Sequence, residues 1–331
     1  MAWHVPVLCR SNQSDQELNR MNQSHQLAFL LKSYSQDAEL AARMVASFHE
    51  FNQDKIPLYI VVPDSDLNLF AKFESDNVTL LPESKFDKHL VNEPVHDLRP
   101  GYINQEIVKL AFWELRLAEN YFCVDSDAEF IRPFTISDFM FDSQTPYSVL
   151  VQDLELAVEP QYYNQYWQSR EKELEHIATL LELDPRVILT CHGHQVFSAK
   201  VLESFVTDFL NPRGWDYRDA LAQAPYEFTW YNLWLQKTKP HEIHPREPWV
   251  KVFHHEGQYL EYVSRGVSVE DLARGYLAVV INSSFARELP KTPSANARSK
   301  SESLAQHLSY GEVAKLIGAK VTGTARNRFT N

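Results

Sequence analysis

Cysteine is rare in this sequence. Three cysteines occur in 331 residues, Cys9, Cys123 and Cys191, and they are far apart and in no paired spacing. This distribution argues against a disulfide framework and against a thiolate zinc site. A reducing, cytoplasmic environment fits such a chain best.

Glycine is scarce as well. The chain has nine glycines, and none of them lies between Leu27 and Phe51, where the first strand and helix are expected. A glycine-rich loop that cradles phosphate groups after the first strand is therefore missing. A phosphate-containing ligand would have to be bound by other groups.

Positive charge is in deficit. Lysine and arginine number 32, aspartate and glutamate number 44, and the formal net charge is −12. This balance disfavours a general electrostatic attraction to nucleic acid or to an anionic membrane surface. We expect no nucleic-acid partner, and any bound phosphate needs a local cation.

Long apolar runs are missing too. No stretch approaches the roughly 18 apolar residues of a membrane span, and the N-terminus lacks a basic start followed by an apolar run. The sequence therefore predicts neither a signal peptide nor a transmembrane segment.

The composition is that of a folded protein with polar ends. Hydrophobic residues make up 44% of the chain, which is enough for one main globular unit. The stretch 11–26 is dominated by polar residues without apolar periodicity, and several prolines and serines follow residue 287. We expect a polar N-terminal arm at 1–26, one domain at 27–289, and a linker with a C-terminal helical tail at 290–331.

Strand-like and helix-like segments alternate along the chain. The expected strands are 27–31, 57–62, 78–81, 121–124, 147–151, 187–190, 249–254 and 277–281. The expected helices are 38–51, 66–73, 102–119, 161–183, 199–210, 215–222, 227–236 and 301–317. This alternation predicts an α/β fold with a mostly parallel central sheet flanked by helices, in which ligands bind at the carboxyl ends of the strands.

Two carboxylates stand where one of these strands ends. Asp125-Ser126-Asp127 follows the apolar run Tyr-Phe-Cys-Val. Two such carboxylates can converge on one hard cation, and Mg²⁺ or Mn²⁺ prefers oxygen ligands together with phosphates. The alternative is an exposed turn in which aspartate caps the backbone.

The Asp-Ser-Asp segment, followed by Glu-Phe-Ile-Arg-Pro-Phe at 129–134, resembles the core of the GT-A glycosyltransferases. It is especially similar to a group of bacterial enzymes that act on surface polysaccharides. The order of elements resembles this superfamily over 27–287. The resemblance implies a single Rossmann-like α/β sandwich in which Asp125 and Asp127 bind a cation that bridges the diphosphate of a nucleotide sugar, with Ser126 beside it. It also implies transfer of the sugar to a hydroxyl of a glycan or polysaccharide acceptor.

The resemblance places further residues near the donor. Lys32, Ser33 and Tyr34 stand where GT-A enzymes receive the base and ribose. Arg99 precedes the helix before the motif. Gln105 and Lys109 are four residues apart on that helix and therefore on one face, beside the donor nucleotide in the resembling enzymes. A solvated surface lysine is the alternative reading of Lys109.

A base for the acceptor hydroxyl is expected at Glu227. Inverting transfer needs a carboxylate that takes the hydroxyl proton, and many of the resembling enzymes have one at a late helix start, as in Pro-Tyr-Glu-Phe-Thr-Trp-Tyr. The alternative is a glutamate that complements the helix dipole. Asp216 is the reserve candidate.

Histidines follow two of the expected strands. His254 and His255 come after Trp-Val-Lys-Val-Phe, and we expect His254 to be a further metal ligand, which would suit Mn²⁺ better than Mg²⁺. A surface pair of histidines is the alternative. The turn His192-Gly193-His194 could contact acceptor or donor sugar, or be purely structural.

Three other classes of protein share some of these features. A haloacid-dehalogenase-type phosphatase normally has Thr or Val two positions after the second aspartate, where this chain has Glu129. A sugar-nucleotide-forming nucleotidyltransferase needs the glycine-rich loop that is missing here. A non-catalytic GT-A-like scaffold that binds carbohydrate or protein stays open, and turnover would separate it from the enzyme.

Overall fold

The computed structural model describes residues 24–151, 157, 160–184, 190, 193–254 and 256–281. Some expectations fall outside this part of the chain: residues 1–23 of the polar arm, most of the strand expected at 187–190, and the linker and tail at 290–331. His192 and His255 also lie outside the described residues.

The described residues form short strands separated by helices. The strands are β1 Ala28–Lys32, β2 Leu58–Val62, β3 Val78–Pro82, β4 Asn120–Val124, β5 Ala128–Phe130, β6 Tyr147–Ser148, β7 Val196–Ser198, β8 His244–Pro245, β9 Val250–Phe253 and β10 Ala278–Ile281. The α-helices are α2 Ala38–Phe51, α3 Leu67–Phe70, α4 Pro100–Ala111, α5 Pro160–Leu180, α6 Ala199–Ser204, α7 Asn211–Arg213, α8 Tyr217–Gln223, α9 Glu227–Thr238, α10 Glu256–Ser264 and α11 Val269–Leu272. Tighter turns of helix are η1 Ser35–Asp37, η2 Asp64–Asp66, η3 Ala71–Phe73, η4 Glu83–Phe86, η5 Phe112–Leu115 and η6 Ile136–Asp138, and the wider π-helical segment η9 Phe205–Leu210 continues α6.

The central sheet has the strand order β3-β2-β1-β4-β7. Strands β1 to β4 are parallel, and β7 runs antiparallel to β4 at one edge. The chain builds the sheet outward from β1 to β3 and then returns to place β4 on the other side of β1. The carboxyl ends of β1 and β4 therefore flank the point where the strand order reverses, which is where open α/β sheets bind ligands.

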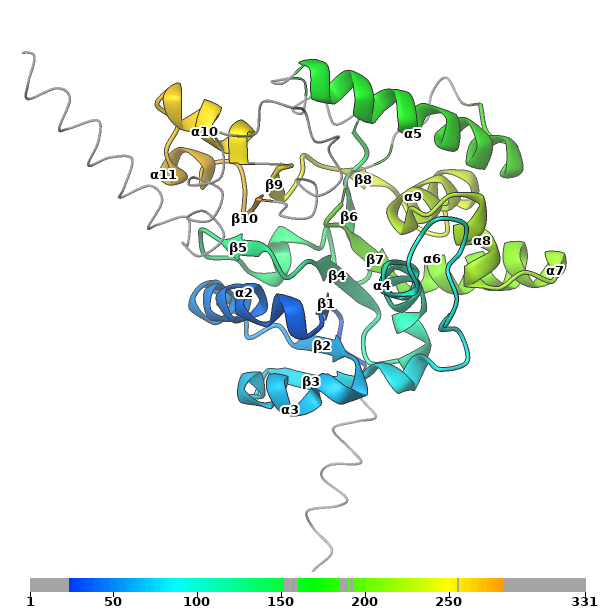
Figure 1. Ribbon diagram of the computed structural model, residues 1–331, viewed down its shortest axis with the longest axis horizontal. Helices are drawn as coiled ribbons and strands as arrows, with labels where there is room; N and C mark the ends of the chain where they lie inside the picture. The colour runs from blue at the N-terminus through cyan, green and yellow to red at the C-terminus, as the bar shows by residue number, and fades with distance from the viewer. Residues whose placement is uncertain are drawn as a thin grey trace, which may run out of the picture.

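Helices cover both faces of this sheet. Figure 1 shows α2 and α3 on one face and α4, α6 and α9 on the other. Strands β2 and β4 are buried along their whole length, and β1 is buried except at Lys32. Continuous apolar runs are typical of parallel strands that are covered on both faces.

A second, smaller sheet has the order β5-β10-β9. Strand β5 begins directly after Asp127, pairs antiparallel with β10, and β10 pairs parallel with β9. Figure 1 shows this sheet beside α10 and α11. The Asp-Ser-Asp segment thus connects the two sheets.

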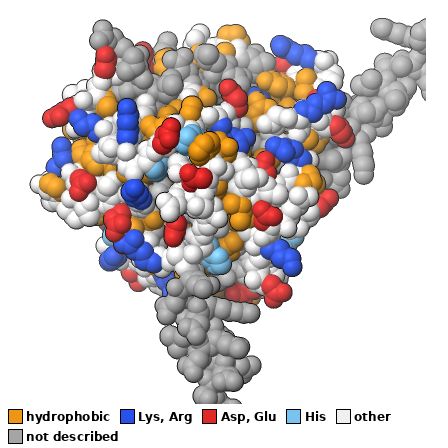
Figure 2. Space-filling model, turned by 180° about the vertical axis from the view of Figure 1, so that it is seen from behind, with side chains coloured by type: hydrophobic (Ala, Val, Ile, Leu, Met, Phe, Trp, Pro, Cys, Tyr) orange, Lys and Arg blue, Asp and Glu red, His pale blue; other side chains and the backbone are white. Residues whose placement is uncertain are grey.

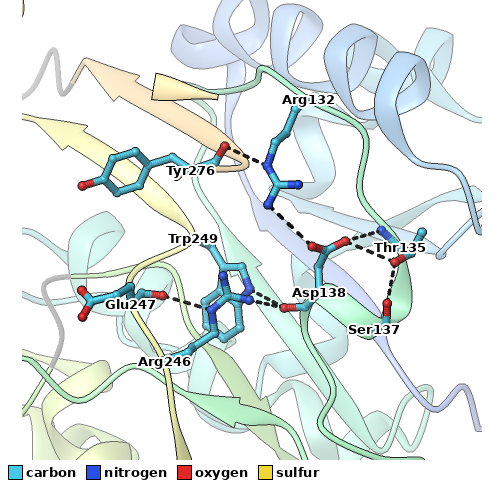
Figure 3. Close-up of polar contacts among 8 residues, drawn as sticks. All are labelled: Arg132, Thr135, Ser137, Asp138, Arg246, Glu247, Trp249 and Tyr276. Carbon is cyan, nitrogen blue, oxygen red and sulfur yellow. Dashed lines mark hydrogen bonds and ion pairs between the residues drawn. The ribbon is translucent and has the colours of Figure 1, made fainter. Parts of the chain in front are cut away.

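A polar cluster fastens the loop after β5 to the second sheet (Figure 3). The backbone carbonyl of Asp138 accepts hydrogen bonds from the Trp249 indole at 2.7 Å and from the Arg246 guanidinium. Arg132 donates to the Tyr276 carbonyl at 3.2 Å, and its other end lies 3.6 Å from the Asp138 carboxylate. This cluster contributes to positioning β9 and β10 against the segment that leaves the candidate site.

The expected α/β fold with a mostly parallel central sheet flanked by helices is confirmed. Strands β5 and β7 were not expected from the sequence. Each has only three residues, which is shorter than the runs of about four to eight residues that a strand pattern needs. The strand expected at 147–151 is shortened to β6, with a single bridge between Val151 and Thr190.

The surface carries charges of both signs. On the face seen in Figure 2, lysine and arginine side chains are interspersed with aspartate and glutamate. None of the described helices combines the length and the apolar character that a membrane span requires.

Candidate functional site

The two expected donor-binding segments meet at the carboxyl ends of β1 and β4. Leu31 pairs with Val124 in the sheet, so Ser33 and Ser126 leave it side by side. The Ser126 hydroxyl donates a hydrogen bond of 2.9 Å to the Ser33 hydroxyl. Both side chains are buried. This contact joins two segments that are 93 residues apart in the chain at the switch point of the sheet.

The Asp125 carboxylate lies between the Lys109 ammonium and the His194 imidazole. One carboxylate oxygen, Oδ1, is 3.2 Å from Lys109 Nζ, and the other, Oδ2, is 3.5 Å from His194 Nε2. Burial raises the pKa of Asp125, but Lys109 and then His194 lower it, and the pKa ends below its usual value. Asp125 is therefore an ionised carboxylate at neutral pH.

Asp127 has the opposite electrostatic environment. Burial, followed by the charge of the neighbouring Asp125, raises the pKa of Asp127 to about 8, and Asp37 from η1 acts in the same direction. In the ligand-free protein this carboxyl group holds a proton at pH 7. The carboxyl groups of Asp37, Asp125 and Asp127 thus lie near one another, and a bound cation would favour the ionised form of Asp127.

Asp125 contacts a buried ion-pair cluster made by Lys109, Glu227 and Glu106. Lys109 on α4 lies 2.8 Å from Oε1 of Glu227, the first residue of α9, as well as near Asp125. Burial lowers the pKa of Lys109, but Asp125, Glu227 and Glu106 raise it well above its usual value. Lys109 is therefore a fully charged ammonium that two carboxylates share.

Glu106 and Glu227 form a carboxylic acid and carboxylate pair. Burial, followed by the charge of Glu227, raises the pKa of Glu106 well above its usual value. Burial also raises the pKa of Glu227, but Lys109 outweighs it and a hydrogen bond from Glu106 adds to the lowering. Glu106 is thus the more readily protonated of the two, and Glu227 is the partner that holds Lys109.

The donor set fits a divalent cation that shares its coordination with a phosphate ligand. Among the described residues, no three His, Cys, Asp or Glu side chains gather as a metal site. Mg²⁺ is commonly held by only one or two carboxylates, with phosphate oxygens and waters completing its shell. Asp127 and Asp125 are the two carboxylates that would hold such an ion.

His254 lies at the same end of the second sheet as Asp127. The sheet pairs Ala128 with Val280, and Val280 with Val252, so β10 separates the two segments. Two strand spacings correspond to roughly 10 Å between backbones. The His254 side chain is buried, and its backbone N–H donates to Gln258 Oε1 at 2.7 Å. Its expected role as a metal ligand stays a prediction.

The other expected contacts differ in their surroundings. Lys32 forms an ion pair with Glu83 at 3.2 Å and donates to the Ser33 carbonyl, while Tyr34 is 37% exposed at the end of β1. Arg99 is the exposed residue that precedes α4, and Gln105 is half-buried on that helix. Tyr34 and Arg99 are accessible to a ligand, whereas Lys32 is already paired.

Glu106 was not expected in the site, and His194 was expected there only as part of the turn that also contains His192. The sequence did indicate that Glu106 is buried, because it falls on the same apolar helix face as Ile103, Ile107 and Leu110. A glutamate on such a face is buried and needs a partner. The sequence did not indicate the position of His194, because β7, the strand that positions it, is too short to recognise from its pattern. The reserve base Asp216 instead caps α8, where it accepts from the Asp219 amide at 3.0 Å.

The chain is similar to solved structures only at low identity. Solved structures that are similar include mouse xyloside xylosyltransferase 1 in its apo form, with a TM-score of 0.43 at 11% identity over 78% of this chain and 99% of that chain. The apo structure of the bifunctional glycosyltransferase WbbM gives a TM-score of 0.44 at 12% identity, over 82% of this chain and 50% of that chain. Likeness at this level indicates nothing about activity. The chain thus aligns with only about half the length of WbbM.

No curated protein matches the chain. One family model does, over residues 27–256, which is 230 of the 331 residues and extends from β1 to the start of α10. The chain therefore belongs to the family described as "Family of unknown function (DUF6492)".

Proposed function

We propose that this chain is a glycosyltransferase that moves a sugar from a nucleotide-diphosphate sugar to a hydroxyl group of a glycan acceptor. One observation carries the proposal: the buried hydrogen bond between Ser33 and Ser126 brings the segments after β1 and β4 together at the switch point, directly beside Asp125 and Asp127. Nucleotides bind at this place in open α/β sheets. The resemblance of the Asp-Ser-Asp segment to GT-A glycosyltransferases supports the same assignment.

The proposed reaction exchanges one bond at the anomeric carbon. The acceptor oxygen forms a bond to this carbon while the bond from the carbon to the diphosphate oxygen breaks, and the electron pair leaves with the diphosphate. A divalent cation held by Asp127, with Asp125 beside it, would supply positive charge for the departing diphosphate. The proton of the acceptor hydroxyl passes to the departing diphosphate or to solvent.

Glu227 is the expected base, but its contacts favour another role. It is buried, it holds Lys109 at 2.8 Å, and its pKa is lowered because Lys109 outweighs the effect of burial. A carboxylate with a lowered pKa is a weak proton acceptor. We therefore assign Glu227 to positioning Lys109, and through it Asp125.

Ligand-dependent stabilisation tests the binding half of the proposal. Nucleoside diphosphates and nucleotide sugars are added to the protein with and without Mn²⁺ or Mg²⁺, and the Tm of thermal unfolding is measured. A ligand at 100 times its Kd contributes about 2.7 kcal/mol, which corresponds to a rise in Tm of several degrees for a chain of this size. We expect the largest rise with nucleotide and cation together.

Asp127→Asn should remove this cation-dependent rise, while Asp87→Asn, a matched change at an exposed aspartate, should retain it. The proposal fails if no nucleotide stabilises the wild-type protein with either cation. It also fails if Asp127→Asn responds to cation and nucleotide as the wild type does.

A product assay separates an enzyme from a non-catalytic scaffold. The nucleotide sugar that stabilises the protein is incubated with a mixture of oligosaccharides, and the products are analysed by mass spectrometry for a gain of one sugar. A carbohydrate-binding scaffold would bind the nucleotide sugar or the glycan and release no nucleoside diphosphate.

A further inference from the structure

His194 is a buried imidazole close to the Asp125 carboxylate. It is 5% exposed, and among the described residues neither ring nitrogen has a hydrogen-bond partner. Its Nε2 lies 3.5 Å from Asp125 Oδ2, a contact without the geometry of a hydrogen bond. Buried polar groups in native proteins are nearly always satisfied, so this imidazole calls for a further partner, and a bound ligand can supply one.

The backbone at His194 is also unusual. Its φ angle is +57°, in the left-handed region that residues with a side chain seldom adopt. Residues held in such conformations cluster at ligand-binding and active sites, because the surrounding structure has to enforce them. Here the enforcement comes from the next residue: the Gln195 carbonyl accepts from the Cys123 amide at 3.1 Å, and Gln195 Oε1 accepts from the Val149 amide at 2.9 Å.

The position of His194 in the sheet indicates which part of a ligand it would meet. Strand β7 pairs with β4 on the side away from β1, and Phe122 faces Val196, so His194 is level with Val124. A nucleotide at the switch point lies between β1 and β4. The part of the ligand beyond its diphosphate would extend over β4 towards β7, across one more strand spacing of about 4.8 Å.

The chemistry around His194 favours a neutral hydroxyl over a phosphate. Lys109, the buried cation on this side of β4, is already shared between Glu227 and Asp125. The Asp125 carboxylate can accept a hydrogen bond from a hydroxyl group, and an imidazole can either donate to it or accept from it. Asp125 Oδ2 and His194 Nε2 lie 3.5 Å apart. Two hydroxyl groups on neighbouring carbons of a sugar can therefore bind one to the carboxylate and the other to the imidazole.

We propose that His194, together with Asp125, binds hydroxyl groups of the transferred sugar and so contributes to the choice of donor sugar. This inference rests on the proposed function. It assigns His194 a contact with the sugar and not with the nucleotide. Loss of its side chain should therefore weaken binding of the nucleotide sugar and leave binding of the nucleoside diphosphate unchanged.

The test compares two ligands on three variants. Uridine, guanosine, cytidine, adenosine and thymidine diphosphates are screened first, and the one that stabilises the wild-type protein is paired with its glucose, galactose or mannose derivative. Dissociation constants for both members of the pair are measured by calorimetry with Mn²⁺ present. His194→Gly suits the left-handed backbone, and His194→Asn keeps a hydrogen-bonding group in a residue that tolerates this conformation. His96→Asn is the matched control, because His96 also has a positive φ, of +53°, but is exposed.

In His194→Gly we expect the Kd of the nucleotide sugar to rise about 5- to 10-fold, as for loss of one hydrogen bond, while the Kd of the nucleoside diphosphate stays within twofold. His194→Asn should fall between this variant and the wild type, and His96→Asn should match the wild type. A deoxy sugar that lacks the contacted hydroxyl should bind the wild type more weakly but His194→Gly no more weakly.

Three outcomes would overturn the inference. If both ligands bind His194→Gly and His194→Asn as they bind the wild type, His194 does not contact the sugar. If both weaken by the same factor, His194 supports the whole site. If the wild type binds no nucleoside diphosphate and no nucleotide sugar, the proposed function fails and the inference fails with it. Should His194→Gly not fold, His194→Asn alone decides between the first two.

Discussion

The Lys109 ammonium lies 2.8 Å from the Glu227 carboxylate, although 118 residues separate them in the chain. Lys109 belongs to α4 and Glu227 begins α9, so the pair fastens together two helices on one face of the sheet. The same ammonium lies 3.2 Å from Asp125 at the end of β4. One buried cation thus connects the two helices to the candidate site and contributes most to lowering the pKa of both carboxylates.

Replacement of Lys109 by methionine should be strongly destabilising. The change leaves the buried Glu227 without a compensating charge, with the partly exposed Asp125 nearby. Loss of one member of a buried ion pair typically costs about 3 to 5 kcal/mol. Chemical denaturation measures the free energy of unfolding. Adding Glu227→Gln to Lys109→Met should restore part of the loss, because it removes one of the uncompensated charges.

Lys72→Met is the control for this experiment. Lys72 is exposed beside the Phe73 ring, so its replacement should change the free energy of unfolding by less than about 0.5 kcal/mol. If Lys109→Met were as stable as Lys72→Met, the buried ion-pair cluster would not exist in solution.

The hydrogen bond between Ser33 and Ser126 should appear as a coupling energy. Either single change to alanine leaves the other buried hydroxyl without this partner and should cost about 1 to 2 kcal/mol. The double change leaves neither group unsatisfied, so its cost should be less than the sum of the two by about 1 kcal/mol. Simple addition of the two costs would show that the hydroxyls do not interact.

The sheet was predictable because its strands are buried on both faces. β1, β2 and β4 are continuous apolar runs bounded by polar residues, and such runs stand out from the helical periodicity around them. The position of Asp125 and Ser126 at a strand end followed from the same pattern. Ser33 was expected at the donor site through the resemblance to GT-A glycosyltransferases, and the parallel pairing of β1 with β4 brings it to the same edge of the sheet as Ser126.

The polar interior of the site was not predictable in the same way. Helical spacing placed Gln105 and Lys109 on one face, but only the packing of α9 against α4 makes Lys109 buried and brings Glu227 to it. The position of Glu227 at a helix start was expected. Its partner, 118 residues earlier, depends on how two helices cross, which the spacing of residues in either helix does not specify.

Stability at acid pH should depend on Glu114. Burial raises the pKa of this carboxyl, but hydrogen bonds from His89, Lys88 and Tyr217 outweigh it and lower the pKa to about 2. A lowered pKa in the folded state stabilises the protein above the unfolded-state value of about 4.3, and this contribution is lost as the pH falls from there towards 2. Because Lys88 is exposed and screened by solvent, we expect a loss of about 1 to 2 kcal/mol.

Glu114→Gln isolates this contribution. The variant lacks the titrating group, so its free energy of unfolding should fall less steeply between pH 4.5 and 2 than that of the wild type. Denaturant unfolding at closely spaced pH values measures both slopes. Parallel curves for the two proteins would rule out a role for Glu114 in the acid transition.

Arg246 should stabilise the junction between the two sheets through its hydrogen bond to the Asp138 carbonyl and its stacking on Trp249, whose ring lies 4.5 Å from the guanidinium carbon. Arg246→Met keeps much of the aliphatic contact with the ring but removes the donor and the charge. A hydrogen bond from a charged group contributes about 1.5 to 3 kcal/mol, and stacking of a cation on an aromatic ring adds about 0.5 to 1 kcal/mol. Arg246→Lys should recover little, because an ammonium lacks the planar group that stacks while donating.

Arg265→Met is the control. Arg265 is an exposed arginine paired with Glu261 one helical turn earlier, and its replacement should cost no more than about 0.5 kcal/mol. Equal unfolding energies for Arg246→Met and Arg265→Met would mean that the junction is held by Trp249 and the apolar contacts around it, without a contribution from the arginine.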